Sequence, residues 1–200
     1  MNFLAHQLLS GGDHQLMVGN FIADFVKGRT ALGQFEREIV KGIELHRAID
    51  AFTDTHPVVA QSKDRLRSKY RHYSGVIVDV FYDHFLARYW NHYHPTPLID
   101  FAQTVYQVME EHHSILPNEV RQMLPYMSRG NWLVNYSKVE GIQRALSGMS
   151  SRTPYVSRME EATTDLVEYY NNFKNEFDTF FPMLQRHCEN WIIDLNQARA

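Results

Sequence analysis

The 200-residue sequence predicts an all-α protein, a single-domain helical bundle covering residues 1–200. Two observations carry this prediction. Apolar residues recur at helical spacing in one segment after another, and the alternating pattern of a β-strand is nearly absent. A chain of this length can bury a substantial core. Its 44% hydrophobic and 13% aromatic content is typical of a globular protein rather than a disordered one.

Composition excludes several classes of function. A net charge of −3 argues against a nucleic-acid partner, and no apolar run is long enough to span a membrane. The single cysteine, Cys188, excludes an internal disulfide bond and fits a reducing compartment. Because the first residues also lack a basic leader, we expect a cytoplasmic protein. Eleven histidines beside 23 acidic residues justify a search for a metal site.

The first elements carry three polar candidates. Asn2–Leu9 is a short apolar segment that contains His6, and two glycines interrupt the chain after it. The spacing of apolar residues then predicts a helix over Gln15–Lys27. Asn20 and Asp24 lie four residues apart in this largely apolar helix, where an isolated carboxylate is rarely buried without a partner. The alternative is a polar stripe between helices.

The next predicted helix, Glu36–Phe52, organises the site. His46, Asp50 and Asp54 follow one another at intervals of four, which places all three side chains on one stripe of a helix. Apolar residues beside this stripe indicate that the helix packs into the core. A divalent metal is one way to satisfy carboxylates at such a position. An exposed polar face with Arg47 as ion-pair partner is the alternative.

A basic segment follows. Pro57 suits the first turn of the helix predicted over Val58–Tyr73. Five cations lie within this helix: Lys63, Arg65, Arg67, Lys69 and Arg71. A solvated helix face is the usual reason for such a run. The functional interpretation is a docking surface for an acidic partner.

A second acidic helix is predicted over Gly75–Trp90. Val76–Val80 alone could be a strand, but the apolar pattern continues at helical spacing. Asp79 and Asp83 are again four residues apart, and His84 follows directly. Like charges at this spacing destabilise an isolated helix. Because the pattern occurs twice, we favour a shared cation over two solvated faces.

The second half of the chain predicts further helices and little chemistry. The expected helices are Leu98–Ser114, Pro117–Tyr126, Val139–Leu146, Val156–Phe177 and Met183–Leu195. The expected breaks are Asn91–Pro97, Ser128–Trp132 and Gly148–Pro154. Met, Tyr, Phe and Trp in the last two helices have the spacing of core residues.

Together the candidate side chains indicate a metal-assisted hydrolase. They are His6, Asp24, His46, Asp50, Asp54, Asp79, Asp83 and His84. A set rich in carboxylates, with some imidazole and no thiolate, suits manganese, iron or magnesium better than structural zinc. Such an ion positions phosphate and activates water, and an adjacent acid or histidine handles protons. No serine elbow or glycine-rich phosphate loop offers another mechanism.

Five stretches in order, four motifs and one looser match, resemble the acyl carrier protein phosphodiesterases, also called holo-acyl carrier protein hydrolases. They are NFLAH (Asn2–His6), VGNFIADFVKG (Val18–Gly28), GIELHRAIDAFTDTHP (Gly42–Pro57), RHYSGVIVDVFYDHFLARYW (Arg71–Trp90) and, more loosely, the C-terminal half. The resemblance implies an all-helical fold, HD-phosphohydrolase-like and divergent. It also implies removal of 4′-phosphopantetheine from holo-acyl carrier protein, in fatty acid and lipid metabolism. The implied cofactor is Mn²⁺, with Mg²⁺ or Fe²⁺ as alternatives.

The site residues follow from the resemblance only in part. The chain has no His-Asp doublet but the reversed Asp83-His84, so ligands cannot be transferred from ordinary HD enzymes by pattern. The predicted metal ligands are Asp24, His46, Asp50, Asp79 and Asp83. Later candidates for metal contact are His6, His84 and Asp54. The predicted catalytic groups are Asp24, His6 and His84.

The implied partner is an acidic helical protein, which the basic segment from Lys63 to Arg71 would bind, with Asn20 as a further substrate contact. Charge reversal at Arg65, Arg67 and Lys69 is then expected to raise KM for the carrier but not for a small diester. Two alternatives stay open. One is an HD-type nucleotide phosphohydrolase, and the other is a non-enzymatic binder of an acidic protein. The sequence does not indicate the oligomeric state.

Overall fold

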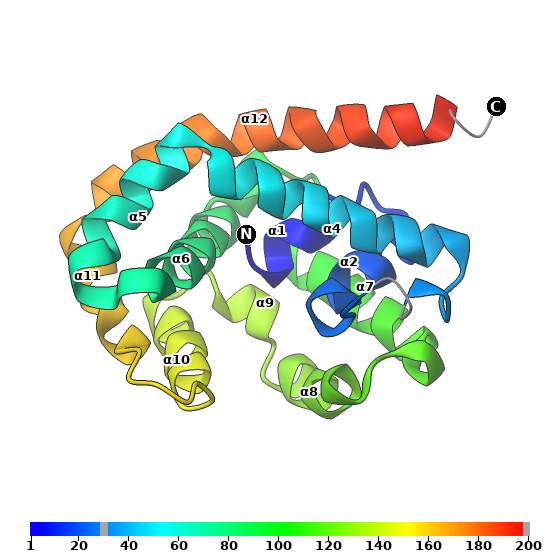
Figure 1. Ribbon diagram of the computed structural model, residues 1–200, viewed down its shortest axis with the longest axis horizontal. Coiled ribbons are helices and arrows are strands. Elements are labelled where there is room, and N and C mark those ends of the chain that lie inside the picture. The colour runs from blue at the N-terminus through cyan, green and yellow to red at the C-terminus, as the bar shows by residue number, and fades with distance from the viewer. Residues whose placement is uncertain (29–31, 198–200) are drawn as a thin grey trace.

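The computed structural model describes residues 1–28 and 32–197, and every regular element within them is helical (Figure 1). The prediction of an all-α domain is confirmed. The α-helices are α1 (Phe3–Leu8), α2 (His14–Ile22), α4 (Arg37–Thr55), α5 (Pro57–Tyr70), α6 (Ser74–Arg88), α7 (Leu98–Glu111), α8 (Asn118–Arg129), α9 (Trp132–Asn135), α10 (Val139–Ser150), α11 (Ala162–Glu168) and α12 (Tyr170–Gln197). Short 3₁₀ turns are η1 (Ala23–Phe25), η2 (Arg71–Tyr73), η3 (Trp90–His92), η4 (His113–Ile115) and η5 (Met159–Glu161).

The closest helix crossing joins α2 to α4. A Cβ atom on Gly19 would lie 2.0 Å from the Ile39 carbonyl oxygen and 2.7 Å from the Cα of Gly42. The two backbones therefore touch, and no side chain larger than hydrogen fits between them. Because this contact lies beside Asn20 and one turn before His46, it brings polar groups of both helices together.

Helix α6 runs through the middle of the molecule, and this position explains why the sequence of α6 is so apolar. Eleven of its fifteen residues are buried, including Phe81, Tyr82 and Phe85. Aromatic side chains of α12 pack against these rings, among them Phe173 and Phe177. A helix that is apolar on nearly all sides belongs in a core, so α6 is the element on which the rest of the bundle is assembled.

Local signals set several helix boundaries. Asp13 caps α2 by accepting hydrogen bonds from the backbone N–H groups of Gln15 and Leu16. Pro57 occupies the first turn of α5, as predicted, and the side chain of His56 caps that turn. The predicted helix Gln15–Lys27 is too long, because α2 ends at Ile22 and continues only as η1.

The C-terminal prediction is wrong in its connections. The helix expected over Val156–Phe177 is broken at Tyr169, and its last part joins Met183–Leu195 in the single helix α12. Pro182 lies inside that helix. A proline costs an α-helix one hydrogen bond, but buried side chains on both sides of it hold α12 on the core. Helix α10 also extends to Ser150, into the expected loop Gly148–Pro154.

Figure 1 shows how the helices are placed around the N-terminus. Helices α4 and α12 cross the top of this view, α8 and α10 lie at the bottom, and residue 1 lies between them. None of the helices in the described ranges combines the length and the hydropathy needed to cross a bilayer.

Candidate active site

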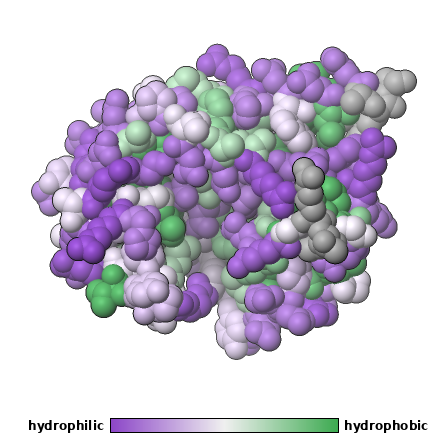
Figure 2. Space-filling view, in the orientation of Figure 1, coloured by the Kyte–Doolittle hydropathy of each residue, from purple (hydrophilic) through white to green (hydrophobic). Residues whose placement is uncertain are grey.

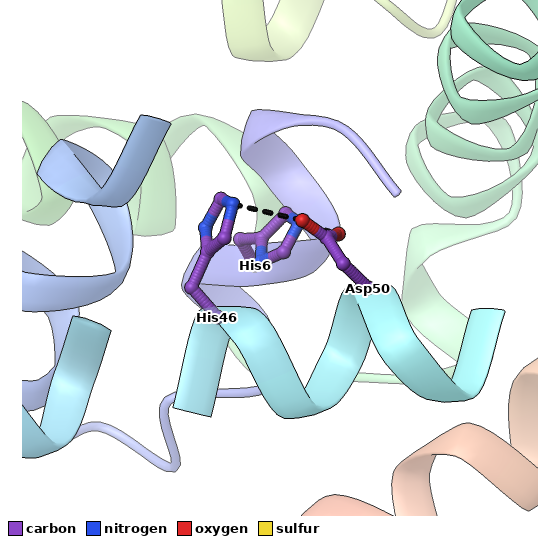
Figure 3. Close-up of side chains that lie close together, drawn as sticks. All are labelled: His6, His46 and Asp50. Atoms are coloured by element: carbon purple, nitrogen blue, oxygen red, sulfur yellow. Dashed lines mark ion pairs between the residues drawn. The ribbon is translucent and has the colours of Figure 1, made fainter. Parts of the chain in front are cut away.

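Three side chains from two helices converge near the N-terminus (Figure 3). His46 and Asp50 lie one turn apart on α4, and His6 comes from α1. The Nε2 atoms of His46 and His6 lie 3.1 and 3.3 Å from the two carboxylate oxygens of Asp50. The two imidazole rings are stacked, with 4.0 Å between their centroids. Both histidines are buried and Asp50 is partly exposed, so the cluster is open on the side of the carboxylate.

Asn20 holds both imidazoles in the same orientation. Its amide nitrogen donates to the His6 carbonyl oxygen and to Ser10 Oγ, so its Oδ1 atom is left to accept. The Nδ1 atom of His6 lies 2.7 Å from this Oδ1, and Nδ1 of His46 lies 2.9 Å from the backbone oxygen of Asn20. Each ring therefore donates through Nδ1, and each directs Nε2 towards Asp50. Such outer contacts fix the tautomer of metal-binding histidines.

A fourth side chain, Asp24, contacts the cluster from the short turn η1, which follows α2. Its Oδ1 lies 3.2 Å from Nε2 of His46, and its side chain is 69% exposed. The predicted reason for its importance was burial in an apolar helix, and that reason is wrong. Because α2 ends at Ile22, Asp24 leaves the apolar stripe and reaches His46 from the surface.

The electrostatics of the cluster favour one added proton, on His46. Burial opposes a charge on His46, but hydrogen bonds to Asp24 and Asp50 outweigh it and raise the pKa of His46 to about 9. Burial lowers the pKa of His6 to about 4. Burial also opposes ionisation of Asp50, yet its contacts with both histidines hold the pKa of that carboxyl below its usual range. A proton on His46 is thus the positive charge among these groups.

The donor set fits a divalent metal. One ligand atom each from His6, His46 and Asp50 lies within 4.8 Å of the other two. Nε2 of His6 is buried and makes no hydrogen bond, although a carboxylate oxygen of Asp50 lies 3.3 Å away. Two electron-pair donors that face each other at this distance are satisfied by a cation between them. A metal would take the place of the His46 proton, because ligands bind metal in the deprotonated form.

The cluster borders a cleft of about 920 Å³, which His46 and Asp50 line and from which His6 is buried. Asp24, His46 and Asp50 line it from one side, and Met123 and Arg152 line it from α8 and the end of α10. Figure 2 shows this face of the molecule hollowed between its two lower parts. The volume is in the range of ligand sites, about 300–1,000 Å³.

Two more acids line the cleft without joining the cluster. Asp79 accepts a hydrogen bond of 2.9 Å from the amino group of Met1, which also lies 3.9 Å from Asp50. Burial raises the pKa of Asp79 above its usual range. Asp54 is exposed and pairs with Lys63 at 3.1 Å. Both predicted acids therefore lie at the cleft, but Asp79 is paired with the amino group of Met1 and Asp54 with Lys63.

Comparison with known proteins identifies the family. A model of the acyl carrier protein phosphodiesterase family matches residues 1–184. The chain belongs to this family. The acyl carrier protein phosphodiesterase of Photorhabdus laumondii subsp. laumondii is 34% identical over 191 residues, which covers 95% of this chain and 96% of the relative. The proteins of that name from Yersinia pestis and Escherichia coli O139:H28 are 33% and 35% identical over 191 and 194 residues, covering 95% of this chain and 98% of each relative. No solved structure matches the chain.

The structure of this phosphodiesterase family member separates Asp83 and His84 from the cluster. Asp83 is fully buried, and its two oxygens accept the backbone N–H groups of Leu4 and Ala5 at 2.7 and 3.2 Å. Burial raises the pKa of Asp83 to about 7. His84 contacts the Tyr136 carbonyl oxygen through Nδ1, and burial lowers its pKa. Asp83 thus anchors α1, which carries His6, and neither residue faces the cleft.

The partner residues predicted for this phosphodiesterase family member are also placed differently. Asn20 is buried among the histidines and does not reach the cleft. Arg65 makes a two-point ion pair with Glu176 of α12, at 2.7 and 2.9 Å, and Lys69 pairs with Asp165. Charge reversal at Arg65 or Lys69 would therefore disturb the packing of α5, so the predicted three-residue test must be changed.

Sequence analysis missed the far wall of the cleft. Met123, Trp132, Met149 and Arg152 line it, and they come from the half of the chain in which only core packing was predicted. The spacing of these four residues along the sequence does not match any catalytic or binding motif. The half-buried aromatic and thioether side chains could have been noticed only as apolar residues flanking the breaks at Gly130 and after Ser150.

Proposed function

We propose that the protein hydrolyses the phosphodiester between 4′-phosphopantetheine and the carrier serine of holo-acyl carrier protein. The products are apo-acyl carrier protein and free 4′-phosphopantetheine. One observation supports this most strongly: two imidazoles and a carboxylate converge, and one imidazole and the carboxylate line a cleft, in a member of the acyl carrier protein phosphodiesterase family. We further propose a divalent cofactor, with Mn²⁺ as the first candidate and Mg²⁺ or Fe²⁺ as alternatives.

His6, His46 and Asp50 would hold the metal through Nε2, Nε2 and a carboxylate oxygen. A bound divalent ion would supply positive charge for the phosphoryl oxygens and lower the pKa of a water molecule. Asn20 keeps both imidazoles in the tautomer with Nε2 unprotonated once His46 has lost its extra proton. The acid Asp83 supports this arrangement from a distance, because it fixes the first turn of α1.

Asp24 is the proposed proton carrier. An exposed aspartate is ionised at neutral pH, and Asp24 lines the cleft beside His46. Water adds to phosphorus, the bond from phosphorus to the serine oxygen breaks, and the proton lost by water passes to that oxygen. Asp24 would accept and return this proton.

Oxygen-18 water tests the reaction and the bond that breaks. Holo-acyl carrier protein is incubated with the protein and Mn²⁺ in H₂¹⁸O, and both products are weighed by mass spectrometry. We expect the carrier to lose its prosthetic group without gaining ¹⁸O, and the released phosphopantetheine to carry one ¹⁸O. An ¹⁸O atom on the carrier would refute cleavage at phosphorus. Hydrolysis of nucleotides with an intact carrier would favour the HD-type alternative instead.

Carrier docking can be tested with the cations that the fold leaves exposed. Arg67 is 65% exposed and pairs only with exposed Asp64, and Arg71 has no ion-pair partner within residues 1–28 and 32–197. We expect the Arg67→Glu, Arg71→Glu double variant to raise KM for holo-carrier about 3- to 10-fold, because rim charges steer an acidic partner. Turnover of bis(p-nitrophenyl) phosphate should not change.

The matched control is Arg186→Glu, which reverses the charge of an exposed arginine on α12, outside the basic segment. It should leave both substrates unaffected. A carrier KM that stays at the wild-type value in the double variant would remove the basic segment from the docking surface.

A further inference from the structure

A second cavity of about 480 Å³ adjoins the cleft on the side away from the metal-binding cluster. We call it the distal chamber, and its own lining includes Tyr136, Gly141, Ala145 and Gly148. The cleft and the distal chamber share five lining residues: Phe3, Met123, Trp132, Met149 and Arg152. The two cavities therefore adjoin along these residues.

The cleft and the distal chamber together form a double cavity, and the polarity of its lining changes from one end to the other. Asp24, His46 and Asp50 lie at the cleft end. The distal chamber is lined mainly by apolar and aromatic side chains, with Asn135, Arg144 and Ser151 as its own polar members, and the two shared methionines can adapt to a flexible ligand. Between them lies Arg152, whose side chain has no ion pair within the described ranges. A guanidinium that lines both cavities can donate hydrogen bonds to the amide carbonyls of a ligand that extends from one cavity into the other.

We propose that the distal chamber holds the thiol end of the pantetheine arm while its phosphodiester lies at the cluster. This inference rests on the proposed function and names the part of the substrate that the second half of the chain recognises. A pantetheine arm has a phosphate at one end, two amides along its length and a thiol at the other. That order matches the order of acid and imidazole, arginine, and apolar wall in the double cavity.

Gly148 provides a position from which to fill the distal chamber. It lies inside α10, lines the chamber, and a Cβ atom built on it would meet nothing within 4 Å. A side chain can therefore be added without a backbone clash. Alanine at this position favours the helix over glycine and leaves most of the chamber open. Phenylalanine would occupy it.

The test compares Gly148→Phe with Gly148→Ala on two substrates. For Gly148→Phe we expect kcat/KM on holo-acyl carrier protein to fall about 10-fold or more, because the arm meets the new ring. Hydrolysis of bis(p-nitrophenyl) phosphate, which has no arm, should stay at the wild-type rate. Gly148→Ala adds only one methyl group to the same wall, so its kcat/KM on holo-carrier should fall between the wild-type value and that of Gly148→Phe. Wild-type turnover of holo-carrier by Gly148→Phe would overturn the inference, and so would an equal loss on both substrates.

A binding measurement without turnover separates this inference from the proposed reaction. Calorimetric titration of the full chain with free 4′-phosphopantetheine should show binding to wild type and Gly148→Ala and a Kd about 10-fold higher for Gly148→Phe. Equal Kd values for all three proteins would overturn the chamber assignment. Tight, Gly148-dependent binding by a protein that leaves every diester intact would instead support the chamber and refute the hydrolase.

Discussion

The Asp50→Asn variant should lose about 10³-fold in kcat on holo-acyl carrier protein, because it removes the charge needed to hold a divalent ion. Asp50 is the carboxylate that both imidazoles of the cluster face, at 3.1 and 3.3 Å. Asparagine has almost the same shape, so the loss should appear without unfolding. The measurement is steady-state release of apo-carrier with saturating Mn²⁺, together with the metal content of the purified protein.

Asp54→Asn is the matched control for this variant. Asp54 lies one turn further along α4, lines the same cleft and undergoes the same change of charge. It pairs with Lys63 instead of a histidine. We expect at most a small change in kcat and the same metal content as wild type. If the two variants lose activity equally, the acidity of the cleft as a whole matters and not the cluster.

The Gly19→Ala variant should be destabilised by about 3 kcal/mol or more, because the added methyl group overpacks the crossing of α2 and α4. Its Cβ would lie 2.0 Å from a backbone oxygen, so the helices must separate. The corresponding fall in Tm is about 6–12 °C for a chain of this size. Because α2 carries Asn20 and α4 carries His46, metal affinity should fall as well. Thermal unfolding by circular dichroism measures the first effect and metal titration the second.

Gly148→Ala makes the same substitution inside α10, where the new methyl group faces open space. It should keep or slightly raise the Tm, because alanine favours a helix over glycine. If Gly19→Ala also kept the wild-type Tm, the close contact of α2 with α4 would be wrong.

Local patterns predicted the helices well where each element signals itself. Apolar spacing predicted α4 and α6, and Pro57 correctly marked the start of α5. The prediction of two closing helices, Val156–Phe177 and Met183–Leu195, was wrong, because the single helix α12 covers the end of one and all of the other. The packing of Phe180 and Phe181 on the core decides that element, and it depends on residues far away in sequence. The HD-like character of the bundle stays a prediction.

The site was predictable only within one helix. Spacing by four placed His46 and Asp50 together, because that geometry is internal to α4. The same spacing in Asp79 and Asp83 has another outcome, since Asp83 anchors α1 through backbone hydrogen bonds. His6 and Asn20 join the cluster through contacts between different helices, which no local pattern contains. For that reason His6 was placed among the later metal candidates, and Asn20 was assigned to substrate.

Crystals grown with Mn²⁺ test the central claim most directly, through an anomalous difference map at the manganese absorption edge. We predict a peak within bonding distance of Nε2 of His6, Nε2 of His46 and a carboxylate oxygen of Asp50. The peak should be absent from Asp50→Asn crystals grown in the same way. A peak elsewhere in the molecule, or none at any Mn²⁺ concentration that supports hydrolysis of holo-carrier, would contradict this assignment of the metal centre.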